Sequence, residues 1–277
     1  MSPTDLILRL TDGLPITAGS FIVTVYGDVV VPRGEVLWIG SLIEICSRIG
    51  ISENLVRTAV SRLVSADRLQ GTRVGRRSFY RLAPAARAEF AQAARMLYAR
   101  PQPSGDWLVM LHPDMPEKVA RSHRMARIGG DLWICPARGD LPETGGLVLR
   151  AAPVAGVDQL SRLAAFWDLQ ALADGYRIVL DRFGPLADGP ALSPEDALIA
   201  RLLLVHLYRG VLLRDPGLPA EALPAGWPGH AAQALFSDFY PALSPLAEAH
   251  IAQVMEGEDG PLPENTPRTQ ARLHALA

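Results

Sequence analysis

The polar residues of one segment have the types and spacing needed to contact DNA. Residues 52–65 have the periodicity of an amphipathic helix, whose apolar half carries Leu55, Val56, Ala59, Val60, Leu63 and Val64. The opposite half carries short polar or positively charged side chains: Asn54, Arg57, Thr58, Ser61, Arg62 and Ser65. Arginine and asparagine can each make two hydrogen bonds to a base edge in the major groove. We therefore predict that this half of the helix binds DNA.

An arginine-rich segment follows the predicted helix. Residues 69–82 have the composition of two short strands, with Gly75 where a tight turn needs a positive φ. Residues 52–81 hold seven arginines against two acids, a local net charge of +5 in a chain of net charge −2. Such a concentration of charge is typical of a phosphate-binding surface. We predict that Arg73, Arg76 and Arg77 contact the sugar-phosphate backbone or the minor groove.

Simpler interpretations exist for these features. A polar helix face can be merely solvated, and Phe79 and Tyr80 are expected to pack the hairpin against the helices rather than stack on bases. The chain has one lysine, Lys118, among its 27 basic residues, which a GC-rich coding bias explains. The clustering of the arginines therefore carries more weight than their number.

The DNA-facing helix needs further elements to position it. Residues 38–49 have helical apolar spacing and are followed by Gly50 and Ile51, so that two residues separate two helices, as in a helix-turn-helix. Ser52 is the expected N-cap of the second helix. Together with the basic hairpin, these elements predict a winged helix-turn-helix. Residues 1–15 are expected to form a short leader, and residues 20–28 have the composition of a strand.

The rest of the chain has a different organisation. A proline- and glycine-containing stretch at residues 100–105 marks a boundary. Beyond it, the pattern predicts strands at 107–111, 131–135 and 146–150, and helices at 117–128 and from about 158. This alternation predicts a small α+β sandwich of ferredoxin-like type. Ser193 is expected to cap the next helix, and a last helix from 230 to about 254 is expected to precede a frayed tail.

We therefore expect an α+β protein of three domains. They are a winged helix-turn-helix at 18–100, a ferredoxin-like domain for dimerisation or signal relay at 106–184, and a helical, effector-related domain at 192–255.

Composition and motif content exclude several classes of protein. The two cysteines, Cys46 and Cys135, are expected to be core thiols in a reducing compartment. The start of the chain lacks the features of an export signal, and the most apolar segment, 197–213, contains charged residues and is short for a bilayer. No nucleophile elbow, nucleotide-binding loop or zinc motif is present. We expect a cytoplasmic protein that is not an enzyme and has no membrane partner, metal or cofactor.

Seven motifs, spread through residues 18 to 255, are specific when taken together. They are Tyr26–Asp28, Trp38–Ser41, Val56–Leu63, Gly75–Tyr80, Leu203–Arg209, Asp215–Pro219 and Leu223–His230. In these motifs the chain resembles the PaaX family of bacterial transcriptional repressors. The resemblance implies the three domains above, and it implies that residues 21–28 form a helix despite their strand-like composition. It also implies repression of a phenylacetate-degradation operon, with release from DNA when phenylacetyl-coenzyme A binds.

Five residues of the C-terminal part are candidates for binding such an effector: His206, Arg209, Arg214, Trp227 and His230. Arginine pairs well with the phosphates of coenzyme A, and a tryptophan offers a flat wall to an aromatic acyl group. The alternative for His206 is a hydrogen-bonded histidine of the core. Asp215 and its neighbouring prolines are expected to fix their loop.

The expected function is that of a homodimeric repressor bound to a near-palindromic operator in double-stranded DNA. Two alternatives remain: a regulator of another aromatic or acyl pathway that responds to a different acyl-coenzyme A, and an enzyme that acts on a coenzyme A thioester. The middle domain also resembles, in predicted fold, nucleases of CRISPR spacer acquisition. Their first strand ends in a metal-binding acid, whereas here Pro113 interrupts Leu111–Asp114, so we expect no nuclease site.

Overall fold

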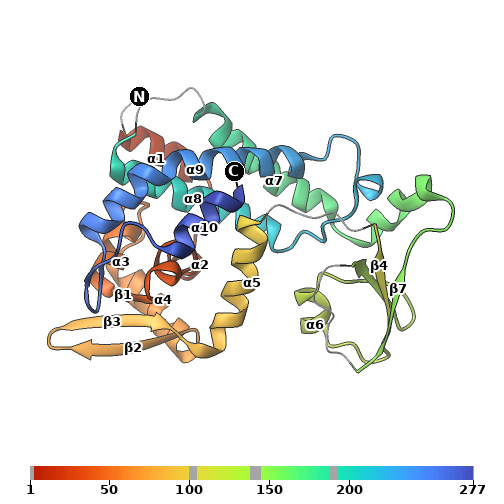
Figure 1. Cartoon of the computed structure of the whole chain (residues 1–277), viewed down its shortest axis with the longest axis horizontal. Helices are drawn as coiled ribbons and strands as arrows, with labels where there is room; N and C mark the ends of the chain where they lie inside the picture. The colour runs from red at the N-terminus through yellow and green to blue at the C-terminus, as the bar shows by residue number, and fades with distance from the viewer. Residues whose placement is uncertain (1–2, 100–104, 138–144, 187–191, 277) are drawn as a thin grey trace. The chain divides into compact units, whose positions relative to one another are not determined.

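The computed structural model describes residues 3–99, 105–137, 145–186 and 192–276 (Figure 1). Helices and small antiparallel sheets are both present, and the predicted α+β class is confirmed.

The chain forms two compact units. The first consists of Met1–Arg100, Ile178–Gly210 and Ala231–Ala277, and the second of Pro101–Arg177 and Val211–His230. The N-terminal and C-terminal stretches of the chain thus share one unit.

A group of three helices and one sheet forms the N-terminal part of the first unit. The helices are α2 (Ala18–Val25), α3 (Ile39–Ser47) and α4 (Glu53–Ser65), and the strands are β1 (Val36–Trp38), β2 (Leu69–Val74) and β3 (Arg77–Leu82). The strands pair antiparallel in the order β1-β3-β2, and α4 packs against both α2 and α3. This arrangement holds α4 and the β2–β3 hairpin next to each other in one framework.

Two details of the turn before α4 differ from the prediction. Five residues, not two, separate the end of α3 at Ser47 from the start of α4 at Glu53. Ser52 occupies the N-cap position with extended backbone, but its side chain makes no capping hydrogen bond. The helix is held by its packing rather than by this cap.

The segment with strand-like composition is helical, as the family resemblance implied. Helix α2 continues into a π-helical turn, η1 (Tyr26–Val30), and then a short 3₁₀ turn, η2 (Val31–Arg33). The side chains of Phe21, Ile22, Val25 and Val29 are fully buried. Burial against several neighbours therefore overrides the weak intrinsic preference of β-branched residues for strands.

Five further helices lie wholly or mostly in the first unit, and two of them extend into the second. They are α1 (Pro3–Thr11), α5 (Arg87–Tyr98), α8 (Pro194–Leu212), α9 (Pro228–Val254) and α10 (Pro267–Leu276). Every residue from Ala197 to Val205 of α8 is buried, as expected of a helix surrounded by others. Ser193 caps α8, because its Oγ accepts a hydrogen bond from the Asp196 backbone N–H, as predicted.

The predictions for both ends of the chain are wrong. The expected leader contains helix α1, in which Leu6 and Leu10 are buried. The expected frayed tail contains a small hairpin, β8 (Glu256–Gly257) and β9 (Gly260–Pro261), followed by α10. Long-range contacts, rather than a local sequence pattern, hold both segments.

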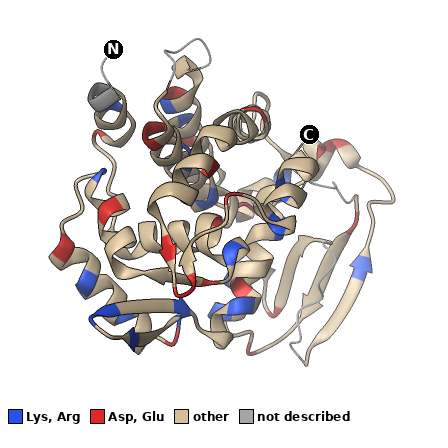
Figure 2. Ribbon diagram, turned by 60° about the vertical axis from the view of Figure 1, so that its left-hand side comes forward, with Lys and Arg blue, Asp and Glu red and all other residues tan. Residues whose placement is uncertain are grey.

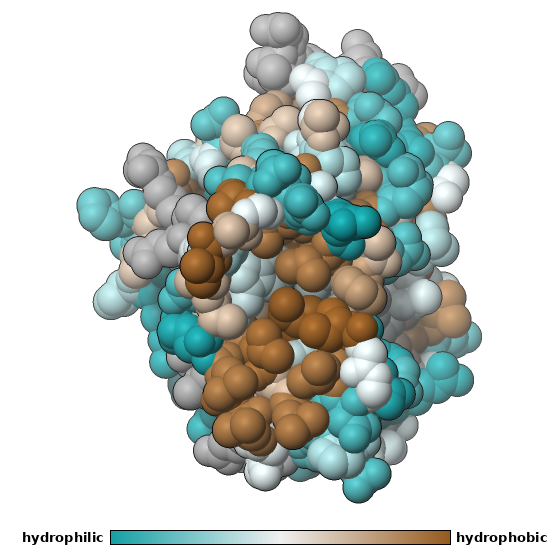
Figure 3. Space-filling view, turned by 90° about the vertical axis from the view of Figure 1, so that its right-hand side faces the viewer, coloured by the Kyte–Doolittle hydropathy of each residue, from teal (hydrophilic) through white to brown (hydrophobic). Residues whose placement is uncertain are grey.

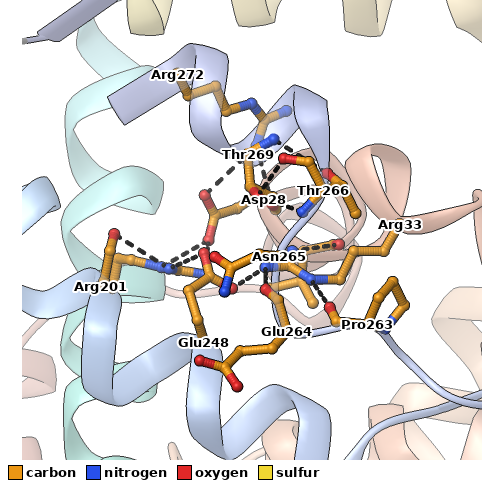
Figure 4. Close-up of polar contacts among 12 residues, drawn as sticks. Asp28, Arg33, Arg201, Glu248, Pro263, Glu264, Asn265, Thr266, Thr269 and Arg272 are labelled. Atoms are coloured by element: carbon orange, nitrogen blue, oxygen red, sulfur yellow. Dashed lines mark hydrogen bonds and ion pairs between the residues drawn. The ribbon is translucent and has the colours of Figure 1, made fainter. Parts of the chain in front are cut away.

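A cluster of charged side chains lies in the interior of the first unit (Figure 4). Arg201 of α8 forms ion pairs with Asp28 of η1 at 3.0 Å and with Glu248 of α9 at 2.8 Å. Arg33 pairs with the other oxygen of Glu248, and Arg272 of α10 lies 3.8 Å from Asp28. We name Asp28, Arg33, Arg201, Glu248 and Arg272 the buried charge cluster.

Two tyrosines complete the surroundings of Asp28. Tyr98 and Tyr240 donate hydrogen bonds of 2.9 and 2.8 Å to its Oδ1. Burial raises the pKa of Asp28, but the nearby arginines and the tyrosine hydroxyls outweigh burial and lower that pKa below its usual value. Asp28 therefore remains a carboxylate in the interior.

The second unit contains a four-stranded antiparallel sheet. Its elements are β4 (Trp107–Leu111), α6 (Glu117–Ser122), β5 (Ala126–Gly129), β6 (Leu132–Pro136) and β7 (Leu147–Ala151), and the strand order is β5-β6-β4-β7. Met110 and Cys135 on one face pack with Ala120 of α6 into a core. Cys46 of the first unit is buried as well, so both cysteines are core residues, as predicted.

Two helix predictions in the second unit need correction. The helix expected to reach residue 128 ends at Ser122, because Arg124 adopts a positive φ of 55° and the chain turns into β5. The helix expected from about 158 is a 3₁₀ segment, η4 (Val157–Phe166), and the α-helix α7 (Leu169–Phe183) begins only after it.

Part of the other face of this sheet is apolar and exposed, whereas Trp107 and Ile134 on the same face are buried. Its exposed side chains, with exposed fractions between 40% and 57%, form neighbouring positions on three strands: Leu111, Leu132, Leu147 and Leu149. Figure 3 shows that apolar side chains gather on this side of the molecule. A face of this kind on a folded protein is typical of an interaction site.

Candidate nucleic-acid interface

Helix α4 is held by a narrower apolar stripe than its sequence indicated. Val56, Ala59 and Val60 are buried where α4 meets α2 and α3. In contrast, Leu55 and Val64 are 57% and 38% exposed, so the prediction that they are buried is wrong. The helical period assigned them to the apolar half, but only Val56, Ala59 and Val60 of α4 are buried by its neighbours.

The predicted DNA-contacting residues of α4 all point to solvent. Asn54, Arg57, Thr58, Ser61 and Arg62 are exposed. Thr58 Oγ1 donates to the Asn54 carbonyl oxygen, and Arg57 forms an i,i+4 ion pair with Glu53 at 2.7 Å. The exposed surface of α4 thus carries polar side chains along the whole helix, together with the apolar Leu55 and Val64.

The hairpin that follows α4 presents further arginines (Figure 2). Arg73, Arg76 and Arg77 lie at its tip and are exposed. The tip residue Gly75 has a φ of +58°, which confirms the reason for a glycine there. Phe79 is buried, as expected of a residue that packs the hairpin against the helices.

Long-range ion pairs reduce the positive charge that this surface offers. Four of its seven arginines have acidic partners: Arg57 with Glu53, Arg68 with Glu89, Arg77 with Glu256, and Arg81 with Glu258. Three of these carboxylates lie outside residues 52–81, so the net charge of +5 counted for that segment did not include them. Within the described residues, Arg62, Arg73 and Arg76 have no ion pair with an acid, and they carry the free charge.

Two of the five effector candidates lie together, on α8. Thr24 Oγ1 of α2 lies 2.9 Å from His206 Nδ1 and accepts a hydrogen bond of 2.8 Å from Arg209 Nε. Arg209 also donates to the Ser20 carbonyl oxygen at 2.8 Å, and the ring of Phe21 meets His206 edge-on. These contacts join α8 to α2, and the interpretation of His206 as a hydrogen-bonded core histidine fits them.

The other three candidates belong to the second unit. Arg214 and His230 are exposed, and the half-buried Trp227 meets the ring of Tyr176 edge-on. Asp215 accepts hydrogen bonds of 2.6 Å from the Tyr176 hydroxyl and from the Gly217 backbone N–H. Asp215 therefore fixes its loop, as predicted.

The environment of His206 keeps its imidazole neutral. Burial, with a further contribution from the neighbouring Arg209 guanidinium, lowers the pKa of His206 to about 4. The unfolded chain, with a histidine pKa of about 6.5, takes up this proton first as the pH falls. The stability that depends on neutral His206 is therefore complete above pH 6.5 and decreases between about pH 6.5 and pH 4.

We predict that His206→Gln reduces the pH dependence of unfolding in this range. The full shift corresponds to roughly 3 kcal/mol in the free energy of unfolding. Denaturant unfolding at several pH values between 4 and 7 measures it, with His230→Gln as a control that removes an exposed histidine. An unchanged pH dependence in His206→Gln would contradict the assignment.

Comparisons with known proteins identify the family to which the chain is similar. Residues 17–86 match the family model described as PaaX-like protein, and residues 167–253 match that of the PaaX-like protein C-terminal domain. The chain is 30% identical to the transcriptional repressor PaaX of Escherichia coli (strain K12), over 95% of this chain and 92% of that protein.

A solved structure and the helices of the chain give further information. Protein Rv0674 from Mycobacterium tuberculosis has a similar fold, with a TM-score of 0.51 and 24% identity, over 84% of this chain and 98% of that chain. Within the described ranges, no helix has the length and apolar character needed to cross a bilayer. Because both family regions are present and the match to a repressor extends over nearly its whole length, the chain belongs to the PaaX family of DNA-binding transcriptional repressors.

Proposed function

We propose that the first unit binds operator DNA as a winged helix-turn-helix. Helix α4 enters the major groove, and the β2–β3 hairpin, which we call the wing, lies along the adjacent backbone. The exposed polar face of α4 supports this proposal, because Asn54, Thr58, Ser61 and Arg62 have the side chains that read base edges. The free arginines of the wing tip, Arg73 and Arg76, supply contacts to phosphates.

The observation that carries the proposal is the shared framework of helix and wing. Strand β2 follows α4 directly and packs against it, so the polar face and the arginine-bearing tip belong to one rigid group of elements. A helix alone could enter the major groove, but it would lack the contacts to the DNA backbone that fix its position along the duplex.

We predict different effects for the two kinds of contact. Arg62→Ala should weaken binding to the operator by about 1–3 kcal/mol while changing binding to unrelated DNA less. Arg76→Ala should weaken binding to both alike and reduce the log–log salt slope by about 0.9. Fluorescence anisotropy with operator and scrambled duplexes over a range of salt concentrations measures both effects.

The matched control for this experiment is Arg121→Ala, which removes an exposed arginine of the second unit. If Arg62→Ala and Arg76→Ala bind both duplexes like the control variant, neither α4 nor the wing is the DNA-binding surface.

We further propose that the sheet of the second unit joins two copies of the chain. The strand order β5-β6-β4-β7 is that of a ferredoxin-like sheet. The four exposed leucines form a face without charge, and two such faces related by a two-fold axis are complementary. A second copy suits a repressor of a near-palindromic operator, because each half-site needs one α4.

Leu149→Glu tests this dimer. A carboxylate buried in an apolar interface is strongly unfavourable, so the variant should be monomeric at concentrations where the wild type is dimeric. Sedimentation analysis measures the change, and Leu246→Glu, which alters an exposed leucine of α9, is the control. A wild-type monomer, or a Leu149→Glu dimer, would contradict the proposed interface.

For the regulated pathway, we propose the phenylacetate operon, with phenylacetyl-coenzyme A as the effector that releases the DNA. The relationship to the Escherichia coli repressor supports this choice. Arg214, Trp227 and His230 are the candidates for contacting the effector. His206 and Arg209 are candidates for relaying its binding, because both contact α2, which supports α4.

We predict that phenylacetyl-coenzyme A dissociates the operator complex and that free coenzyme A does not. A tenfold weaker operator affinity requires about 1.4 kcal/mol of coupling. Gel shifts with a panel of acyl-coenzyme A compounds, together with an assay for free thiol, measure release and hydrolysis. Release by another thioester would favour a different pathway, and steady formation of thiol would favour the enzyme alternative.

A further inference from the structure

We propose that the β8–β9 hairpin near the C-terminus restrains two arginines of the wing, and that its carboxylates set the affinity and salt dependence of operator binding. This proposal rests on the proposed function, because it needs the wing to contact DNA. Glu256 and Glu258 are its positioning residues, and they act through Arg77 and Arg81.

The two ion pairs join segments that are far apart in the sequence. Glu256 pairs with Arg77, and Glu258 lies 2.8 Å from Arg81. Arg77 and Arg81 are four residues apart on β3, and because side chains alternate between the two faces of a strand, both point to the same side of the wing. The guanidinium of Arg77 also lies over the ring of Trp38, 4.5 Å from its centroid. The hairpin thus holds Arg77 in one defined position.

The carboxylates come from a fixed support. The backbone N–H of Glu256 donates to Ser41 Oγ of α3 at 3.1 Å, and the Leu262 N–H donates to the Met255 carbonyl oxygen at 2.8 Å. Strand β8 packs along β1, where a Cβ at Gly257 would lie 3.4 Å from the Val36 carbonyl oxygen. The hairpin is therefore part of the DNA-binding framework.

These ion pairs are weak enough for DNA phosphates to replace the carboxylates as partners of the arginines. Arg77 and Arg81 are 49% and 41% exposed, and an exposed ion pair contributes about 0–1 kcal/mol. Contacts between arginine and phosphate are stronger and release a counterion from DNA. Phosphates of DNA can therefore bind Arg77 and Arg81, but the ion pairs with Glu256 and Glu258 must break first.

The loss of these ion pairs should change the salt dependence of DNA binding. A carboxylate that loses its arginine attracts a cation from solution, and this uptake opposes the release of cations from DNA. Removing the carboxylate should therefore make the log–log salt slope steeper by up to about 0.9 for each arginine that reaches a phosphate. A role of the hairpin in folding alone would not change this slope.

The experiment compares Glu256→Gln and Glu258→Gln with Asp259→Asn. Asp259 lies in the same hairpin and is exposed, and no ion pair joins it to an arginine within the described residues. The control thus removes an equal charge without freeing an arginine. Operator affinity is measured by fluorescence anisotropy from low to physiological salt, and thermal unfolding checks that each variant is folded.

We expect the two glutamate variants to bind operator about two- to fivefold more tightly than wild type at low salt, with a steeper salt slope. Asp259→Asn should leave the slope unchanged. In an Arg77→Gln background, Glu256→Gln should have no further effect, because the restrained arginine is absent.

Three results would overturn the proposal. Weaker binding by folded Glu256→Gln and Glu258→Gln would show that the pairs support the DNA-binding conformation. Equal changes in all three acidic variants would show a general effect of charge. An unchanged slope would show that the arginines do not reach phosphate. Failure of the wild type to bind any operator fragment would instead contradict the proposed function itself, and the hairpin proposal with it.

Discussion

The architecture of the first unit depends on the buried charge cluster around Asp28 and Arg201. A charge in the protein interior is tolerated only when it is paired and hydrogen-bonded. Here the partners come from five places in the chain: η1, η2, α8, α9 and α10. Loss of one member would leave another buried without its counter-charge. The cluster therefore explains why the N-terminal and C-terminal stretches fold as one unit.

This constraint bears on how the proposed effector could influence the proposed DNA-binding surface. Helix α2 supports α4 on one side and accepts hydrogen bonds from Arg209 of α8 on the other. Asp28, in the helical turn that continues α2, is tied to α8 through Arg201. A displacement of α8 would thus strain both contacts, and relief of that strain requires α2 to move. The proposed coupling between an effector and α4 would therefore need no pathway beyond this shared helix.

Local signals in the sequence predicted the elements that form from local contacts. The period of α4, the glycine at the wing tip and the strands β2, β3, β4, β6 and β7 are visible in short windows. Strands β1 and β5 were missed, because residue 38 and residues 126–128 were assigned to predicted helices. The sequence did not reveal which apolar residues find a partner, so Leu55 and Val64 were expected in the core. Helices α1 and α10 were missed because contacts from distant segments hold them, such as those from Arg182 to the carbonyl oxygens of Arg9 and Asp12.

The charge of the proposed DNA-facing surface shows the same limit most clearly. Counting charges along residues 52–81 cannot include Glu256 and Glu258, which lie 179 and 177 residues from the arginines they neutralise. Helix α9 carries Glu248 of the buried charge cluster, and Glu256 follows its end at Val254 by two residues. One helix therefore connects the interior of the unit to the acidic hairpin. A change that moved α9 would alter both the support of α2 and the proposed restraint on the wing, so both of the effects proposed for DNA binding would occur together.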